Sequence, residues 1–138
     1  MKHKTVTPRD IDALLEFLPA LEKPGRAFIL RWAGGEAVDA ETTTTRYPIY
    51  ADDVLAFFGQ AGAPCWSDTS YNPRVAAKML EDEALIARAT LDEIRTMLTL
   101  CVRGERFGDG YWGSLLEKGR ITAILRRLAV LRHPPERE

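Results

Sequence analysis

Apolar residues recur at intervals of three and four over much of the chain, which is the spacing of amphipathic helices. In the last third, one such stripe follows the capping box of Thr90 and Glu93 and predicts a helix to about Phe107. A second stripe ends just before His133, and a short helix around Trp112 is expected between the two. The C-terminal part of the chain is therefore predicted to be helical throughout, with glycine-rich turns between the helices.

Helix-start signals add three helices in the first two thirds of the chain. Thr7 and Asp10 form a capping box around a proline, and the helix that follows should end or kink at Pro19. Ala51 precedes an apolar helix face with aspartates in its first turn, where negative charge favours the helix dipole. Asn72 is a suitable N-cap for a short helix that begins at the next residue, a proline.

Residues 27–50 lack a clear period. The apolar run Ala27–Trp32 fits either a buried strand or the start of a helix, and Gly34-Gly35 interrupts it. The threonines of 42–45 favour β-structure, so the pattern allows a small hairpin around the two glycines. Tyr47–Tyr50 should be extended, because a residue before proline avoids the helical region.

Together these patterns predict a mainly α fold. We expect one compact helical domain over residues 1–138, with about five or six helices and room for a small β-hairpin within 27–50. The tails 1–6 and 133–138 are expected to be mobile, as chain ends usually are.

Composition narrows the function classes. With 46% hydrophobic residues, 28% charged residues and a net charge of −1, the chain is typical of a soluble globular protein and has no overall field for nucleic acid or an anionic membrane. The two cysteines, Cys65 and Cys101, cannot form a disulfide framework, and His3 and His133 lie close to the ends. We therefore expect a cytoplasmic protein with no membrane partner, no metal and no cofactor, and we assign no catalytic residue.

The densest group of charged, aromatic and glycine residues spans 103–114. Arg103 and Arg106 share one side of a helix, and Arg106 can reach Asp109, which is also a natural cap for the next helix. Two interpretations stay open: a site that binds an anionic ligand or a partner's carboxylate, or a half-buried ion network that fixes the angle between two helices. The candidate residues are Arg103, Arg106, Asp109, Trp112, Ser114 and Glu117.

Residues 108–113 also match the dinucleotide fingerprint G-x-G-x-x-G. That motif binds a pyrophosphate only between a strand and a helix of a βαβ unit, with an acid about 20 residues further on. Here the preceding residues are predicted to be helical, and no acid occurs between Lys118 and Pro135. The glycines are better interpreted as turn and cap residues.

The same segment resembles a family of small bacterial and archaeal proteins known only as a domain of unknown function. The resemblance is strongest over about 92–128, and residues 47–50 give a weaker match. It implies a shared fold and no substrate. The residues that carry it are Leu98, Thr99, Arg103, Arg106, Phe107, Asp109, Gly110, Ser114, Glu117 and Gly119.

These observations favour a non-enzymatic interaction or regulatory module that binds a protein partner or a second copy of itself. An alternative is a protein or enzyme that binds a small anionic ligand through the Arg103–Glu117 segment. A third hypothesis is a nucleic-acid-binding accessory protein, which the acidic remainder of the chain makes the least favoured. Its basis is the basic face of the last predicted helix, formed by Arg120, Arg126, Arg127 and Arg132.

Overall fold

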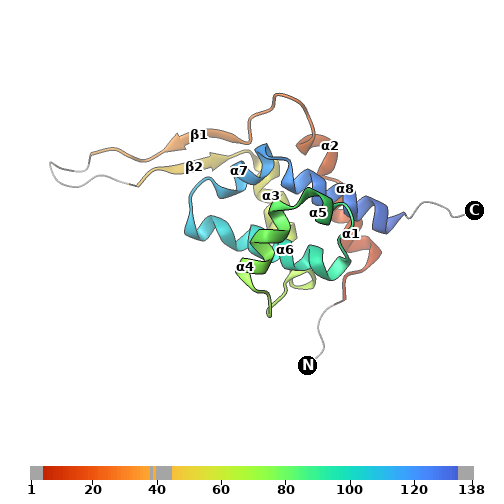
Figure 1. Ribbon diagram of the computed structural model, residues 1–138. Coiled ribbons are helices and arrows are strands. Elements are labelled where there is room, and N and C mark those ends of the chain that lie inside the picture. Colours follow the sequence, from red (N-terminus) through yellow and green to blue (C-terminus); the bar gives the residue numbers. More distant parts are fainter. Residues whose placement is uncertain (1–4, 38, 40–44, 134–138) are drawn as a thin grey trace, which may run out of the picture.

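A computed structural model describes residues 5–37, 39 and 45–133, which form a helical body and one β-hairpin (Figure 1). The mainly α fold and the small hairpin are both confirmed. The helices are α1 (Pro8–Leu15), α2 (Leu18–Leu21), α3 (Asp52–Ala61), α4 (Pro73–Glu81), α5 (Glu83–Ile86), α6 (Leu91–Gly104), α7 (Tyr111–Glu117) and α8 (Arg120–Arg132). The 3-10 helices are η1 (Pro64–Trp66) and η2 (Glu105–Phe107), and the strands are β1 (Ile29–Ala33) and β2 (Tyr47–Tyr50).

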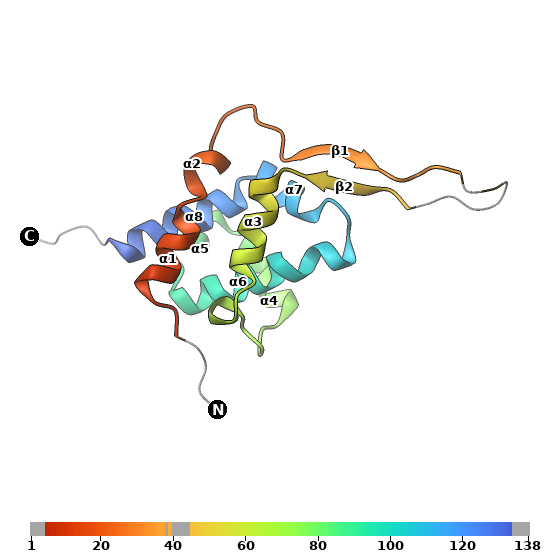
Figure 2. The same cartoon turned by 180° about the vertical axis from the view of Figure 1, so that it is seen from behind.

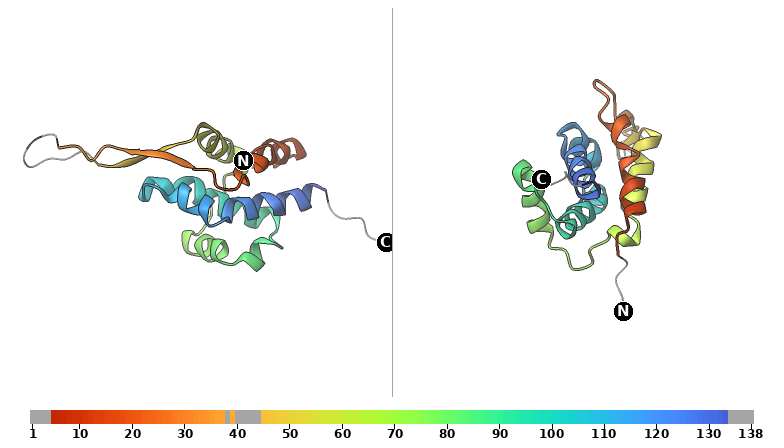
Figure 3. Two further views of the ribbon diagram at one scale, coloured as in Figure 1. Left: turned by 90° about the horizontal axis from the view of Figure 1, so that it is seen from above. Right: turned by 90° about the vertical axis from the view of Figure 1, so that its right-hand side faces the viewer.

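The helices are arranged in three layers (Figure 3). Helices α1 and α3 form one outer layer, α4 and α5 form the other, and α6 and α8 lie between them. Apolar side chains from all three layers meet in a hydrophobic cluster around the central helices. Among the fully buried side chains of this cluster are Phe57, Trp66, Ile94, Met97 and Ile124. Burial of these stripes against one another stabilises the body, because short helices are marginal on their own.

The predicted helix caps form as expected. The Thr7 hydroxyl accepts the Asp10 amide while the Asp10 carboxylate accepts the Thr7 amide, and Thr90 makes the same exchange with Glu93. The Asn72 side chain accepts amides in the first turn of α4. The first predicted helix does break near Pro19, with α1 ending at Leu15 and α2 beginning at Leu18.

The segment 27–50 contains an antiparallel hairpin with a different connection from the one expected. Strand β1 ends before Gly34, but its partner is β2 rather than the threonines, so no tight turn forms at the two glycines. Thr42, Thr43 and Thr44 lie outside the described residues, as do most of the tails expected to be mobile. The register pairs Trp32 with Pro48, and an irregularity between Ile29 and Arg31 leaves Leu30 without a pairing partner.

We call β1 and β2 together the arm. The start of β1 and the end of β2, which are paired, lie beside α7 and α3, and from there the arm extends beyond the helical body (Figures 1 and 2). At its base, the Ala51 amide donates to the Phe28 carbonyl at 2.9 Å. The Arg26 guanidinium also donates to the Asp53 carboxylate, with Nη2 and Oδ1 2.9 Å apart. These contacts attach the arm to the first turn of α3.

The helix predicted to run to about Phe107 is an α-helix only as far as Gly104, and the remaining residues form a 3-10 helix. Helix α6 ends at Gly104, and η2 tightens the chain over the next three residues. Gly104 is buried, and a Cβ at this position would lie 2.2 Å from the ring of Tyr111. The aromatic ring thus packs directly on the helix backbone, and the chain turns sharply beyond this contact. No helix in the described ranges is long and apolar enough to cross a membrane.

Candidate functional site

The Glu105 carboxylate holds the start of α7. Its Oε2 accepts the Gly110 amide at 2.8 Å, and its Oε1 accepts the Trp112 amide at 2.9 Å. Free amides at a helix start need such acceptors, and a negative charge there is favoured by the helix dipole. The residue before α7, Gly110, has a left-handed φ of 90°, which glycine adopts without strain. The cap is therefore Glu105 and not Asp109, whose side chain makes no capping bond to α7.

We call the turn between α6 and α7, residues 105–110, the joint. Tyr50 connects this joint to the arm. Its hydroxyl donates to Glu105 Oε1 at 2.8 Å and accepts the Gly113 amide at 3.3 Å. Burial, followed by the hydrogen bond to Glu105, raises the pKa of the Tyr50 hydroxyl above its usual range. The hydroxyl consequently remains protonated and a donor at neutral pH. One carboxylate thereby joins the last residue of β2 to the first turn of α7.

Trp112 fastens α7 to two other helices. Its indole nitrogen donates to the carbonyl of Cys101 in α6 at 2.8 Å. Its ring stacks on Phe58 of α3, with centroids 4.3 Å apart and planes within 6°. Both contacts are of the kind that stabilises a helix packing angle. Trp112 is thus a packing residue at the joint.

Arg103 and Arg106 line the same small cavity of about 190 Å³, between the end of α6 and the end of α3. The Arg103 guanidinium carbon lies 5.2 Å from the centroid of the Tyr71 ring, in cation–π geometry. Ser67 and Thr99 complete the polar part of the wall. The structure therefore brings together the two arginines that the sequence singled out.

The other candidate residues lie elsewhere. Asp109 and Glu117 are exposed, and Ser114 is half-buried inside α7 rather than at its start. Among the described residues, no ion pair joins Arg103 or Arg106 to any carboxylate. The described residues therefore contain no ion pair of the expected network, and at the turn between α6 and α7 Glu105 makes hydrogen bonds instead.

Residues 108–113 do not form a dinucleotide cradle. They follow α6 and η2, so no strand precedes the glycines and the βαβ context of the motif is missing from this part of the described chain. This agrees with their interpretation as turn and cap residues.

Comparison with known families places this geometry in context. A family model described as a family of unknown function, DUF6508, matches residues 6–134. The chain belongs to this family. The match is wider than the segment 92–128 on which the resemblance was strongest, and it includes the arm as well as the joint. No curated protein and no solved structure matches this DUF6508 chain.

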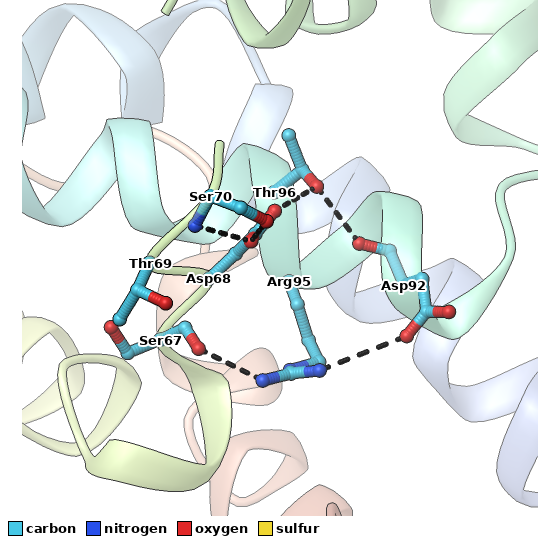
Figure 4. A pocket seen from close by; sticks show the side chains of 7 residues that line it. All are labelled: Ser67, Asp68, Thr69, Ser70, Asp92, Arg95 and Thr96. Atoms are coloured by element: carbon cyan, nitrogen blue, oxygen red, sulfur yellow. Dashed lines mark hydrogen bonds and ion pairs between the residues drawn. The ribbon is translucent and has the colours of Figure 1, made fainter. Parts of the chain in front are cut away.

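A second, polar cavity of about 300 Å³ was not predicted (Figure 4). It lies between the loop 67–70 and the first half of α6, and the Arg95 side chain extends between Ser67 and Asp92 (Figure 4). Arg95 Nη2 donates to the Ser67 carbonyl at 2.8 Å, while its Nε is buried with no hydrogen-bond partner among the described residues. The Asp68 carboxylate accepts the Thr96 hydroxyl at 2.7 Å and both the amide and the hydroxyl of Ser70. The hydrogen bond from Thr96, the largest cause, lowers the pKa of Asp68.

The basic face of α8 is largely occupied by internal contacts. Arg120 pairs with Glu83 at 3.0 Å, Arg126 with Glu22 at 3.2 Å and Arg132 with Asp12 at 3.0 Å. The fourth arginine, Arg127, donates to the carbonyl of Ala89 at 2.8 Å. Each ion pair reduces the positive charge available to phosphates on that face, and in this DUF6508 chain the four arginines hold α8 to its neighbours.

Proposed function

We propose that the protein is a non-enzymatic interaction module and that its arm binds an extended segment of a protein partner. The observation that carries this proposal is the exposure of large apolar side chains on the arm. Leu30 is 62% exposed, Tyr47 50% and Trp32 41%. Phe107, which is 84% exposed, lies on the turn that leads to Gly110, where the Trp32 ring packs. Clustered exposed apolar side chains are typical of interaction surfaces.

The backbone of β1 supports the same surface. Trp32 is paired with Pro48, which has no amide hydrogen, so the two form a non-hydrogen-bonded pair of the antiparallel ladder. In such a pair the amide and carbonyl of Trp32 point away from β2. Neither group makes a backbone hydrogen bond to another described residue outside the strand pair. Such an open edge can accept one more strand, which gains affinity from the backbone and specificity from side chains such as Leu30 and Trp32.

The joint supports a binding role rather than a catalytic one. The Glu105 carboxylate accepts three hydrogen bonds from Tyr50, Gly110 and Trp112. A carboxylate held in this way stabilises a turn, and its lone pairs are not directed at an open cleft. The same bonds hold the base of the arm firmly against α7, which lowers the entropy cost of presenting the arm to a partner.

Site-specific photo-crosslinking tests the proposal. A benzophenone amino acid is placed at position 30 on the arm and, as a matched control, at position 55 on α3. Both positions hold leucines of similar exposure, 62% and 50%, on different elements of the fold, β1 and α3. The variants are irradiated in cells of the source organism, and the adducts are identified by mass spectrometry.

We expect a discrete adduct from position 30 that position 55 does not give. The partner is then produced in pure form, and Trp32→Ser should weaken its binding at least about tenfold, as removal of an aromatic anchor does. If the adduct is a second copy of this chain, sedimentation equilibrium should show a dimer that Trp32→Ser dissociates. Equal labelling from both positions, or no adduct from position 30, contradicts the proposal.

A further inference from the structure

The cavity beside Arg103 and Arg106 has an unusual charge balance. Its lining residues are Ala61, Gly62, Ser67, Thr99, Val102, Arg103 and Arg106, so two arginines and no acidic residue line the cavity. We propose that this cavity binds a small oxyanion, a phosphate or carboxylate group, through Arg103 and Arg106. The cavity lies outside the arm, so its occupancy can be tested without the arm's partner.

Half-buried Arg103 and exposed Arg106 differ from most other half-buried arginines of the fold in having no carboxylate partner among the described residues. Arg26, Arg120 and Arg132 each pair with a carboxylate on another element. Arg103 and Arg106 lie three residues apart with no ion pair to any described residue, so their charges reinforce one another at the cavity. A guanidinium presents a planar fork of donors that matches a carboxylate or phosphate, and a bound oxyanion would neutralise both groups.

Neighbouring residues prepare the cavity for such a ligand. The ring of Tyr71 lies under the Arg103 guanidinium, which restricts its orientation and reduces the entropy lost on binding. The Ser67 hydroxyl is a further polar group in the wall. The Thr99 hydroxyl is already committed, because it accepts the Asp68 amide at 2.9 Å and donates to the Arg95 carbonyl at 2.8 Å. Thr99 therefore shapes the wall, and the arginines and Ser67 supply the donors.

Two acids on neighbouring segments, Glu105 and Asp68, already have other hydrogen-bond partners. The Glu105 carboxylate is held by the start of α7 and by Tyr50, and the Asp68 carboxylate is held by Thr96 and Ser70. The cavity volume of about 190 Å³ is below the roughly 300–1,000 Å³ of drug-sized ligand sites. The ligand group is therefore small, such as a single phosphate or carboxylate.

Titration of the ¹⁵N-labelled protein by NMR tests this site. Sodium phosphate and sodium acetate are added separately at constant ionic strength, with sodium chloride as the reference. We expect saturable shifts of the amides of Ser67, Val102 and Arg103 with at least one of the two oxyanions. Stronger binding of phosphate assigns the site to phosphate-bearing ligands, and stronger binding of acetate assigns it to carboxylates. The absence of saturable shifts beyond those caused by chloride overturns the proposal.

Variants separate the site from general electrostatics. Arg103→Gln/Arg106→Gln should weaken the bound oxyanion at least about tenfold, as loss of charge-assisted hydrogen bonds does. Arg9→Gln/Arg88→Gln removes the same charge from two exposed positions outside the cavity and should leave the affinity unchanged. Equal weakening by both pairs contradicts the proposal. Arg106→Gln alone alters an exposed side chain and should weaken binding in a folded protein, so the test does not depend on the stability of the double variant.

Discussion

Glu105→Ala is expected to destabilise the protein more than any other substitution of an acidic residue near the joint. The change removes the acceptor of three hydrogen bonds, at 2.8, 2.9 and 2.8 Å, and leaves the Tyr50 hydroxyl and the amides of Gly110 and Trp112 without it. Hydrogen bonds to a charged group contribute about 1.5–3 kcal/mol each when buried. Because Gly110 is only half-buried and water can replace part of each bond, we take about 1 kcal/mol for each. The expected loss in the free energy of unfolding is therefore about 3 kcal/mol.

Urea unfolding followed by circular dichroism measures this loss. Glu105→Gln should lose about 1–2 kcal/mol, because its amide oxygen can still accept a donor while its NH₂ group faces the Gly110 amide. Glu117→Ala is the matched control: this glutamate is exposed on α7, and its loss should change stability by less than about 0.5 kcal/mol. Hydrogen exchange of the Gly110 and Trp112 amides should accelerate only in the Glu105 variants. The reasoning is refuted if Glu105→Ala and Glu117→Ala are equally stable, or if both amides remain protected.

Three further predictions follow from the packing and the pKa shifts. Gly104→Ala should lower the free energy of unfolding by about 2 kcal/mol, because the added Cβ would overlap the ring of Tyr111. Gly108→Ala is the control in the same urea assay and should change it little, because no atom lies within 4 Å of its Cβ. The hydrogen bond from Arg26 lowers the pKa of Asp53 in the folded state. The pair therefore stabilises the protein above the ordinary carboxyl pKa of about 3.9, and this stabilisation is lost as the pH falls further. Asp53→Asn should flatten that part of the acid unfolding curve, and an unaltered curve would contradict the assignment. Burial raises the pKa of the Cys101 thiol to about 12. Iodoacetamide at pH 8 should therefore label this thiol only after unfolding, which mass spectrometry can determine. Rapid labelling of the native protein would show that the thiol is accessible.

The helical body could be predicted from the sequence because its signals are local. The capping pairs Thr7–Asp10 and Thr90–Glu93 act over three residues, and both form. The apolar stripes likewise act within single helices and give the buried faces directly. What they do not give is how one helix lies against the next, since that depends on contacts between distant residues.

The arm and the cap of α7 could not be predicted for this reason. The register of β1 and β2 depends on which residue reaches which across a connection of more than ten residues, and the threonines of 42–45 favour β-structure as much as Tyr47–Tyr50 does. The capping role of Glu105 has no local sequence signal, because a cap normally lies one residue before the helix. The 3-10 turn of η2 brings this side chain back to amides five and seven residues ahead, and its third partner, Tyr50, is 55 residues away.

The shared carboxylate of Glu105 also has a thermodynamic consequence. Through its hydrogen bond to Tyr50, this carboxylate connects the base of the arm to the segment 103–106. Arg103 and Arg106 of that segment line the cavity. Suppose that a strand added to β1 shifts Tyr50 and that an anion between the arginines shifts the backbone of η2. Either event then changes the free energy of the same set of bonds. Linkage requires that each occupant alter the affinity of the other by an equal factor, so a small metabolite and a macromolecule could report on one another through a single side chain.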